Sequence, residues 1–523
     1  MRPLACSLLA CLALGVASGD ELQDSNYIPW VSADAVMVSG PKCLGPPEGG
    51  MQIGSVGCPP ESHAEFLSAI RHWRMARRNY IGYDGSRYDS PALRWTQSNF
   101  IEPQVMVEDR YLYDPELHEY TVDRYLRDVK ERYGGIDSIL LWPLYTNMGI
   151  DNRNQLDMIR AMPGGVAGVK QMIADFHRRG VRVLFPMTMW DQGTRDPGKP
   201  WPEAIAELMK EIDADGINGD TQDGVPLVFS HAAERIGHPL AFQPENALGD
   251  EALAWNVTSW WEEQDPTKYA QFVPKINRYK WLETRHMANI SDRSSRDHTD
   301  DLQVAFFNGI GWVSWENVWG IWNGITPRDG EATRRIATIE RAAASFLISA
   351  DWEPFYPMQS FGVFASRWPL PGQTVWTIVN RNEYDVDGPQ MAVPFKAGIH
   401  YFDLYHGTEI TGERDGDNLL LSFPIESHGF GAVLATEGRP PPALMTLMHT
   451  MRTMSARPLS SFSHDWRPLP QRMTTKWSTA STVRRRPAVE SLRSPASRRS
   501  TSADRSAGRV RVSDGLSCER RAG

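Results

Sequence analysis

Apolar and polar positions alternate along the chain in a way that predicts strands and helices in turn. Ile136 to Tyr145 is a continuous apolar run, as expected of a strand that is covered on both faces. Val181 to Trp190 is a second such run, and Gly165 to Gly180 between them has a helical pattern that ends at a glycine. Residues 205, 208 and 212 mark one apolar face of a helix over 201–212. This alternation predicts a parallel sheet covered by helices.

Other segments extend the pattern to about eight strands. Further helices are predicted over 61–78, 120–133 and 331–349, and further strands over 105–107, 216–220, 278–283, 304–315, 352–357 and 361–368. The length and the strand count predict a (β/α)8 TIM barrel over residues 95–370. A doubly wound open sheet is the alternative, but no G-x-G-x-x-G follows the first strand, so that alternative lacks its dinucleotide signature.

The pattern changes twice after the barrel. Residues 371–437 hold short strands separated by turn residues, which predicts a small antiparallel β-sandwich domain. Residues 438–523 are rich in Arg, Ser and Pro, with sixteen Arg and one Lys against five acidic residues, which predicts a disordered basic tail. Such a tail fits an anionic partner or, in the interpretation we prefer, a frame-shifted or mis-spliced continuation with no selected function.

The N-terminal region indicates entry into the secretory pathway. Arg2, the apolar run Leu4 to Leu14 and the small residues that follow predict a signal peptide over 1–19, too short to span a bilayer. Residues 20–94 then form an N-terminal wrap with a lead-in helix. We expect a secreted or lumenal glycoprotein with no membrane partner. A disulfide between Cys43 and Cys58 and N-glycans at Asn256 and Asn289 are predicted for that compartment.

Composition narrows the chemistry. The chain holds 19 Trp in 523 residues, many beside acids and glycines, and sugar rings bind to aromatic faces flanked by carboxylates. The predicted substrate-binding residues are Trp142, Trp190, Asp191, Trp281, Arg285, Trp315 and Trp319. No zinc signature, P-loop or G-x-S-x-G elbow is present, so no metal and no cofactor is predicted. Residues 1–438 hold 38 basic against 59 acidic residues, a net charge of −21, which argues against polyanionic substrates and a nucleic-acid partner.

Acids recur where the predicted strands end, at the active-site face of a barrel. Asp220 closes the glycine-rich stretch Asp213 to Gly224 and suits an ionised nucleophile or base. Glu316 lies among tryptophans that would raise its pKa and suits the acid of a retaining carboxylate pair. Glu283 is the reserve acid, and Asp292 is a weaker one.

The residues also carry a family resemblance. Residues 95–437 resemble secreted (β/α)8 glycoside hydrolases of the α-galactosidase/α-amylase-like kind, through Ile139–Pro143, Phe185–Asp191, Asp215–Asp220 and the Trp-Glu-Asn-Val-Trp run. The resemblance implies that Asp220, after the fourth strand, stands at the nucleophile position. The chain is also similar to proteins in which such a barrel precedes a formylglycine-generating (sulfatase-modifying factor) domain, but no such domain is visible in this sequence.

The sequence therefore predicts a secreted glycoside hydrolase that acts on a carbohydrate substrate. Two alternatives stay open. One is a catalytically inactive barrel that binds carbohydrate. The other is a metal-dependent hydrolase that uses Asp191, Asp220 and Asp223, since a D-x-D-G stretch also occurs in calcium loops.

Overall fold

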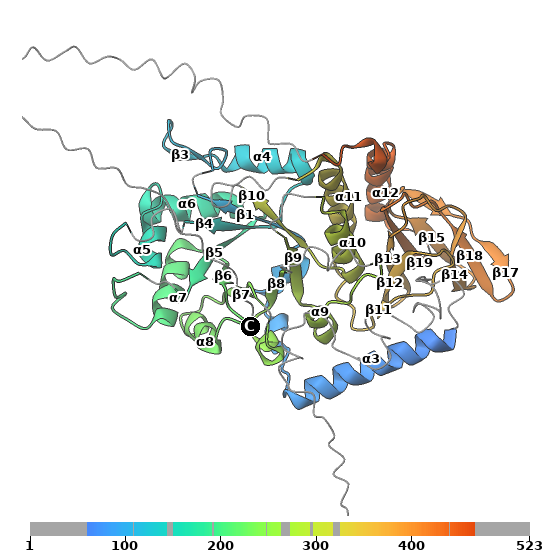
Figure 1. The fold of residues 1–523 in the computed structure, drawn as a ribbon, viewed down its shortest axis with the longest axis horizontal. Coiled ribbons are helices and arrows are strands. Elements are labelled where there is room, and N and C mark those ends of the chain that lie inside the picture. The colour runs from blue at the N-terminus through green and yellow to red at the C-terminus, as the bar shows by residue number, and fades with distance from the viewer. Residues whose placement is uncertain are drawn as a thin grey trace, which may run out of the picture. The chain divides into compact units, whose positions relative to one another are not determined.

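The computed structural model describes residues 60–107, 109–143, 150–190, 193–246, 248–262, 272–292, 297–316, 325–438 and 440–465. These residues belong to one compact unit, which ends at Arg472. They form a (β/α)8 barrel followed by two antiparallel sheets (Figure 1). No helix in the described ranges is long and apolar enough to cross a membrane.

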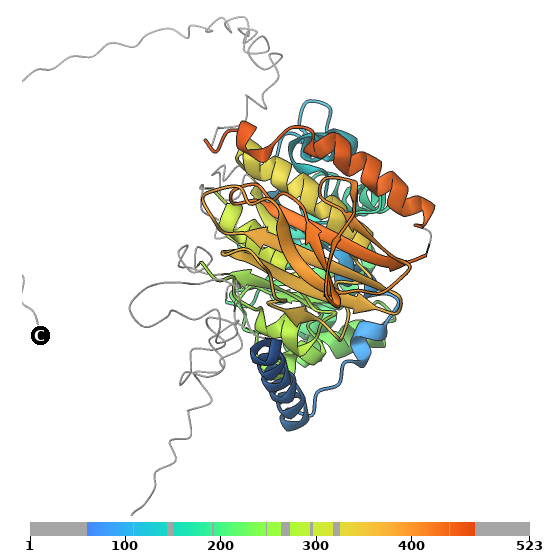
Figure 2. The ribbon, with the colours of Figure 1, turned by 90° about the vertical axis from the view of Figure 1, so that its right-hand side faces the viewer.

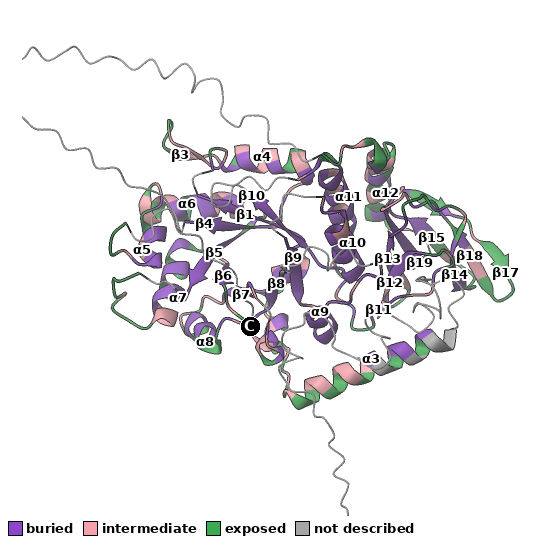
Figure 3. Cartoon of the chain, in the orientation of Figure 1, coloured by how far each residue is buried: buried purple, intermediate pink, exposed green. Residues whose placement is uncertain are grey.

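Eight parallel strands form the barrel, in the order β7-β6-β5-β4-β1-β10-β9-β8, and the end strands β7 and β8 lie beside each other. Its strands are β1 Ile101–Met106, β4 Ser138–Trp142, β5 Arg182–Thr188, β6 Gly216–Asp220, β7 Ala241–Pro244, β8 Thr258–Glu262, β9 Met287–Ser291 and β10 Trp312–Glu316. Figure 3 shows these strands largely buried, as expected of a parallel sheet that is covered on both faces.

Helices cover the outside of this sheet. They are α3 Pro60–Tyr80, α4 Val122–Tyr133, α5 Gln155–Arg160, α6 Gly165–His177, α7 Trp201–Ile212, α8 Leu227–Arg235, α9 Arg278–Leu282, α10 Thr299–Asn308 and α11 Pro327–Ala343. Short 3-10 turns lie at Ser86–Asp89, Arg94–Ser98, Asp250–Ala254 and Leu459–Ser461, and β2 Tyr113–Asp114 pairs with β3 Glu119–Tyr120 as a small hairpin. The helices predicted over 61–78, 120–133, 201–212 and 331–349 are confirmed within a few residues.

The first four strands stand where the sequence predicts them, and β10 Trp312–Glu316 matches the end of the strand predicted over 304–315, but the three strands between them do not. The segment 278–283 is helix α9, and 304–308 belongs to helix α10. The fifth and sixth strands are β7 and β8, in a stretch for which no strand was predicted. The segment 361–368, predicted as a barrel strand, lies mostly in β12 Val363–Leu370 of the antiparallel region instead. The barrel therefore ends before residue 353 rather than at residue 370.

The antiparallel region contains a six-stranded and a three-stranded sheet. The larger has the order β11-β12-β13-β19-β15-β16 and the smaller β14-β18-β17. Their bounds are β11 Glu353–Pro354, β12 Val363–Leu370, β13 Gln373–Asn380, β14 Pro389–Pro394, β15 Ile399–Asp403, β16 Thr408–Ile410, β17 Glu413–Asp415, β18 Asn418–Ser422 and β19 Phe430–Glu437. Figure 2 shows these strands in orange. One face of the larger sheet packs on the barrel helices and the other on the smaller sheet, which confirms the sandwich.

The segment after residue 438 departs from the predicted disordered tail. Helix α12, Pro442–Ser455, buries Leu444, Met448 and Met451 in the main hydrophobic core. Further along, the backbone carbonyl of Ser463 accepts a 3.1 Å hydrogen bond from the backbone N–H of Arg328 at the start of α11. The described part of the chain thus continues as folded structure beyond the two sheets, to residue 465.

Candidate active site

Asp220 is the last residue of β6, and it lies inside the mouth of the barrel. β5 pairs with β6 so that Thr188 stands opposite Asp220. Two residues earlier on the same strand, Asn218 donates a 3.1 Å hydrogen bond to Gln243 of β7 within the barrel. Since side chains alternate along a strand, Asp220 shares this inward face. It is only 5% exposed.

Glycine permits the close packing of this strand. A Cβ added to Gly216 would lie 2.7 Å from the carbonyl oxygen of Ala241 on β7. The stretch begins at Asp213, which caps α7 with a left-handed φ of 65°, and Asp215 binds the ring of His177 at 2.7 Å and Arg182 at 2.8 Å. Asp213 and Asp215, which precede β6, therefore have structural roles, whereas Asp220 ends the strand at the mouth.

Glu245 stands beside Asp220 and was not among the predicted site residues. Gly219 pairs with Pro244, and the N–H of Glu245 continues the ladder by donating to the carbonyl of Gly219 at 3.1 Å. Its carboxylate Oε2 accepts a 2.7 Å hydrogen bond from the N–H of Thr221, next to Asp220. Glu245 is 6% exposed. Two buried carboxylates thus follow neighbouring strands at one level of the mouth.

Three tryptophans form the floor beneath these acids. Trp142, Trp260 and Trp315 project into the barrel, where they pack with Met106, Leu140, Met158, Leu184 and Val313. Trp315 also donates from Nε1 to the hydroxyl of Ser291 at 3.1 Å. All three indoles are buried, so Trp142 and Trp315 support the mouth instead of offering an open stacking face.

Trp190 is different, because its side chain is 52% exposed. It follows β5, and its Nε1–H donates a 3.0 Å hydrogen bond to Oδ2 of Asp220. Of the predicted platforms that the structure describes, Trp190 is the one that combines an exposed ring with contact to an acid of the mouth.

Glu316 lies at the end of β10 but faces out of the barrel. Arg132 of α4 binds it with both terminal nitrogens, at 2.8 and 3.1 Å, and the hydroxyl of Tyr133 donates to it at 3.1 Å. The neighbouring Trp315 faces inward, so strand alternation places Glu316 on the outer face. The predicted pairing of Glu316 with Asp220 is therefore wrong, because the sheet separates the two side chains.

Glu283, Arg285 and Trp281 belong to the opposite end of the barrel. Glu283 caps the C-terminus of α9, before β9 begins. Arg285 donates to both of its oxygens and Tyr83 to one, at 2.9 to 3.0 Å. Burial opposes ionisation, but these Arg285 hydrogen bonds hold the pKa of Glu283 below its usual range. Trp281 is fully buried and donates to the carbonyl of Ile70. None of the three can serve a site at the mouth.

A third acid of the mouth region lies after β9. Asp292, His298 and Asp301 each place one ligand atom within 4.8 Å of the others, and all three are buried. His298 Nδ1 is 2.7 Å from Asp301 Oδ2. Among the described residues, these three side chains are the ones whose ligand atoms lie close enough together to hold a metal ion. Of the residues of the predicted metal-dependent alternative, Asp220 and Asp223 are described, and neither belongs to this group.

The two predicted N-glycosylation sites, Asn256 and Asn289, both lie inside the fold. Asn256 is buried, and its Nδ2 donates to the carbonyls of Val225 and Ala252. Asn289 is also buried, with Nδ2 donating to the carbonyl of Asn99. The fold therefore does not present either amide to a glycan, and those two predictions are corrected. Asp191, Trp319, Cys43 and Cys58 lie outside the described residues.

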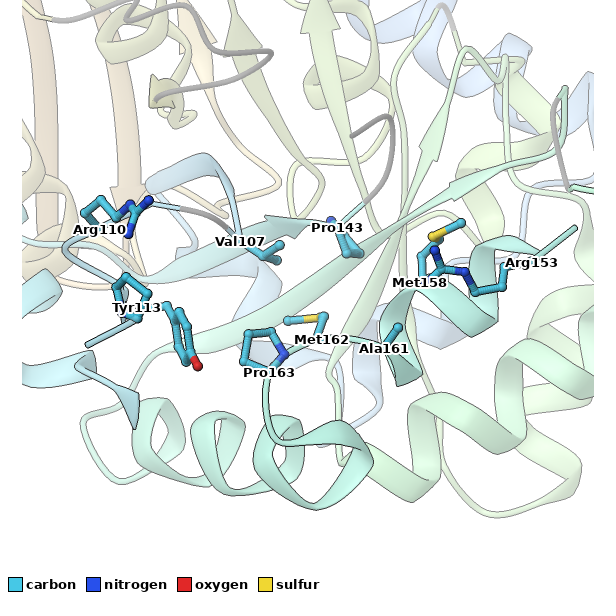
Figure 4. A pocket seen from close by; sticks show the side chains of 10 residues that line it. Val107, Arg110, Tyr113, Pro143, Arg153, Met158, Ala161, Met162 and Pro163 are labelled. Atoms are coloured by element: carbon cyan, nitrogen blue, oxygen red, sulfur yellow. The ribbon is translucent and has the colours of Figure 1, made fainter. Parts of the chain in front are cut away.

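A cavity of about 430 Å³ lies next to the C-terminal ends of β1 and β4. Figure 4 shows Arg110 and Arg153 at its two ends, with Met162 and Pro163 between them. Met158 lines this cavity and also packs in the floor cluster with Trp142. Val107 and Pro143 directly follow β1 and β4, so the cavity lies at the same end of the barrel as the two acids, but neither Asp220 nor Glu245 lines it.

No family model and no curated protein matches this chain. Solved structures with a similar layout include an α-amylase from Anoxybacillus, with a TM-score of 0.46 and 12% identity over 66% of this chain and 99% of that one. The α-amylase of Geobacillus thermoleovorans in complex with acarbose gives the same values. A cyclomaltodextrinase has a TM-score of 0.45 and 11% identity over 65% of this chain and 78% of its own.

Proposed function

We propose that this protein is a glycoside hydrolase whose catalytic pair is Asp220 and Glu245. The observation that carries the proposal is the position of the two carboxylates on neighbouring parallel strands, in register and on the inner face of the barrel mouth. Glycosidic bond cleavage requires two carboxyl groups that flank the bond. This pair replaces the one predicted from the sequence, and Asp220 is common to both.

The strand geometry favours retention of configuration. Neighbouring strands lie about 4.8 Å apart, so two carboxylates on one face at one level can approach the spacing of about 5–5.5 Å found in retaining enzymes. Asp220 would attack the anomeric carbon while Glu245 gives its proton to the departing glycosidic oxygen. Glu245 would then take a proton from the water that displaces Asp220.

The surroundings of the pair suit this division of roles. Trp190 donates a hydrogen bond to Asp220, and such a bond stabilises the ionised carboxylate that a nucleophile requires. The exposed ring of Trp190 also offers a sugar a flat apolar surface next to that carboxylate. The buried tryptophans below exclude water from the floor, which strengthens electrostatic interactions at the reacting atoms.

The test is hydrolysis of a panel of aryl glycosides and oligosaccharides by the full chain and by two variants. Asp220→Asn should abolish turnover of every substrate. Glu245→Gln should abolish turnover of oligosaccharides but retain cleavage of aryl glycosides with good leaving groups, because these need no proton. Asp223→Asn, which changes an exposed acid three residues from Asp220, is the matched control and should retain activity.

Each other outcome has a definite meaning. The anomeric configuration of the first product can be read by NMR of its anomeric proton. Inversion would overturn the retaining mechanism and would make Asp220 or Glu245 the base that activates a water molecule. Activity that survives both substitutions would exclude the pair. Saccharide binding without turnover of any substrate would support the inactive barrel that the sequence left open.

We further propose that the protein acts in the secretory pathway or outside the cell. The signal-peptide pattern over residues 1–19 supports this location. N-terminal sequencing of the protein recovered from its native compartment tests the proposal, which predicts a mature chain that begins near residue 20.

A further inference from the structure

The cavity beside the ends of β1 and β4 has two arginines in its lining. Its walls include Arg110, Tyr113, Arg153, Met162 and Pro163, and its volume of about 430 Å³ falls within the range of small-molecule sites. Figure 4 shows the two arginines at opposite ends of the space, with apolar side chains between them. Among the described residues that line it, none is an acid. The lining therefore favours a ligand that carries negative charge.

Arg153 has hydrogen-bond donors that a ligand can use. Its Nε donates to both oxygens of Asp151, each at 2.9 Å, and no hydrogen bond joins its two terminal nitrogens to a described residue. The side chain is 28% exposed. Asp151 does not line the cavity, so a ligand that enters meets the guanidinium and not its partner. The N–H groups of a guanidinium match two oxygens of a carboxylate or a sulfate, and such charge-assisted bonds are about twice as strong as neutral ones.

The loop that carries Arg153 is braced by the segment that follows Trp190 in the chain. The backbone N–H of Arg195 donates to the carbonyl of Asn152 at 2.9 Å. A Cβ added to Gly193 would collide with the carbonyl oxygen of Arg153, so the close approach of the two backbones requires glycine. The backbone of Arg153 is thus held in place before any ligand arrives, which lowers the entropic cost of binding.

The same wall is bonded to the strand end that stands opposite Asp220. Gln155 begins helix α5, which also carries Met158 of the cavity lining. The side chain of Gln155 exchanges two hydrogen bonds with the main chain of Thr188, at 2.8 and 3.2 Å. Thr188 in turn stands opposite Asp220 in the pairing of β5 with β6. The cavity and the proposed nucleophile therefore share one hydrogen-bonded framework at the same end of the barrel.

We propose that this cavity binds an acidic sugar, through the carboxylate of a uronic acid or through a sulfate ester. The inference rests on the proposed glycoside hydrolase function and extends it by naming a class of glycan, one that carries an acidic unit. Arg153 and Arg110 would bind the anionic group, and Met162 and Pro163 would pack against the apolar side of the ring. The acidic net charge of residues 1–438 opposes a long polyanion, whereas a single acidic unit responds to the local field of the arginines.

The test follows the methyl resonance of Met162 by NMR in the full chain carrying Asp220→Asn, and Met162→Leu identifies this signal by its loss. The probes are glucuronate, galacturonate, glucose 6-sulfate and galactose 6-sulfate, each measured beside neutral glucose or galactose. At least one acidic sugar should shift the resonance saturably below about 10 mM, ten times the Kd of a millimolar site. Comparison of the uronates with the sulfate esters shows which anionic group the cavity takes. Arg153→Gln should weaken that binding at least about tenfold, because a charge-assisted pair is lost.

Arg160→Gln is the matched control. Arg160 ends α5, pairs with Asp157 at 3.6 Å and does not line the cavity, so its replacement should leave the affinity unchanged. A Met162 resonance that no acidic sugar moves would overturn the proposal. Equal shifts by the neutral sugars would overturn it too, as would shifts by inorganic sulfate and acetate that match those of the acidic sugars, because the cavity would then select a simple anion.

The binding measurement is separate from turnover. A saturable shift of Met162 by an acidic sugar, in a protein whose unaltered chain hydrolyses no glycoside, would support the acidic-sugar site and count against the hydrolase. Hydrolysis of neutral glycosides alone, with no shift of Met162 by any acidic sugar, would support the hydrolase and overturn the site.

Discussion

Trp190 donates its indole N–H to Oδ2 of Asp220 at 3.0 Å, and the exposed ring thereby touches a carboxylate that is almost completely buried. In the proposed function, this side chain would bind a sugar ring with its face and stabilise the ionised carboxylate of Asp220 with its indole N–H.

Trp190→Phe should separate these two roles. The ring remains, but the hydrogen bond to the ionised Asp220 is lost, and such bonds contribute about 1.5–3 kcal/mol. We expect kcat/KM to fall at least about tenfold and the acid limb of the pH–rate profile to move to higher pH, because the ionised form loses a donor. A fall in affinity with an unchanged pH profile would mean that Trp190 only binds substrate.

Glu316 should prove structural when it is replaced. Its pair with Arg132 is buried, and removing one partner of a buried pair costs about 3–5 kcal/mol. Glu316→Gln should lower the free energy of unfolding by about 3 kcal/mol while kcat per folded molecule stays the same. The double variant with Arg132→Met should be less destabilised than the sum of the two single variants, as urea unfolding would show. Lost activity at unchanged stability would restore Glu316 as a catalytic candidate.

The barrel could be predicted from the sequence because its first strands are apolar on both faces. Segments such as Ile139–Leu141 and Val183–Phe185 keep their signal without any tertiary information. β8 and β9 lack this signal, because Thr258, Ser259, Asn289 and Ser291 are buried polar residues that bond within the fold. From the sequence alone, a strand made of such polar residues cannot be distinguished from a loop, because the groups to which they hydrogen-bond are far away in the chain.

The site was predictable in part for a related reason. Asp220 follows a short strand between glycines, which is visible locally, whereas Glu245 follows Ala241–Pro244, only four residues long. The face of Glu316 could not be read without the register of β10 and the position of Arg132. The sequence can show that an acid lies at the end of a barrel strand. Whether its side chain faces into or out of the barrel, which decides its role, depends on the register of the strand.

Lys280 should give the protein a measurable pH dependence of stability. It is fully buried, and burial lowers its pKa to about 7. An unfolded lysine stays protonated up to about pH 10.4, so between these values the unfolded state binds more protons and stability rises with pH. Lys280→Met should therefore stabilise the fold below about pH 7 and remove this rise. Urea midpoints for Lys280→Met and for the control Lys170→Met, at an exposed residue of α6, would measure both effects.

Helix α12 should be essential to stability although it lies outside the barrel and both sheets. Leu444, Met448 and Met451 are buried in the main core, and the carbonyl of Arg457 accepts a 2.6 Å hydrogen bond from the buried Arg335. Burying each such apolar side chain contributes about 1.5–3 kcal/mol, so a chain that ends at residue 437 should be roughly 5 kcal/mol less stable than one that ends at residue 465. Thermal unfolding of the two chains measures the difference. Equal stability would mean that residues 438–465 contribute nothing to the fold, as the composition of the tail predicts.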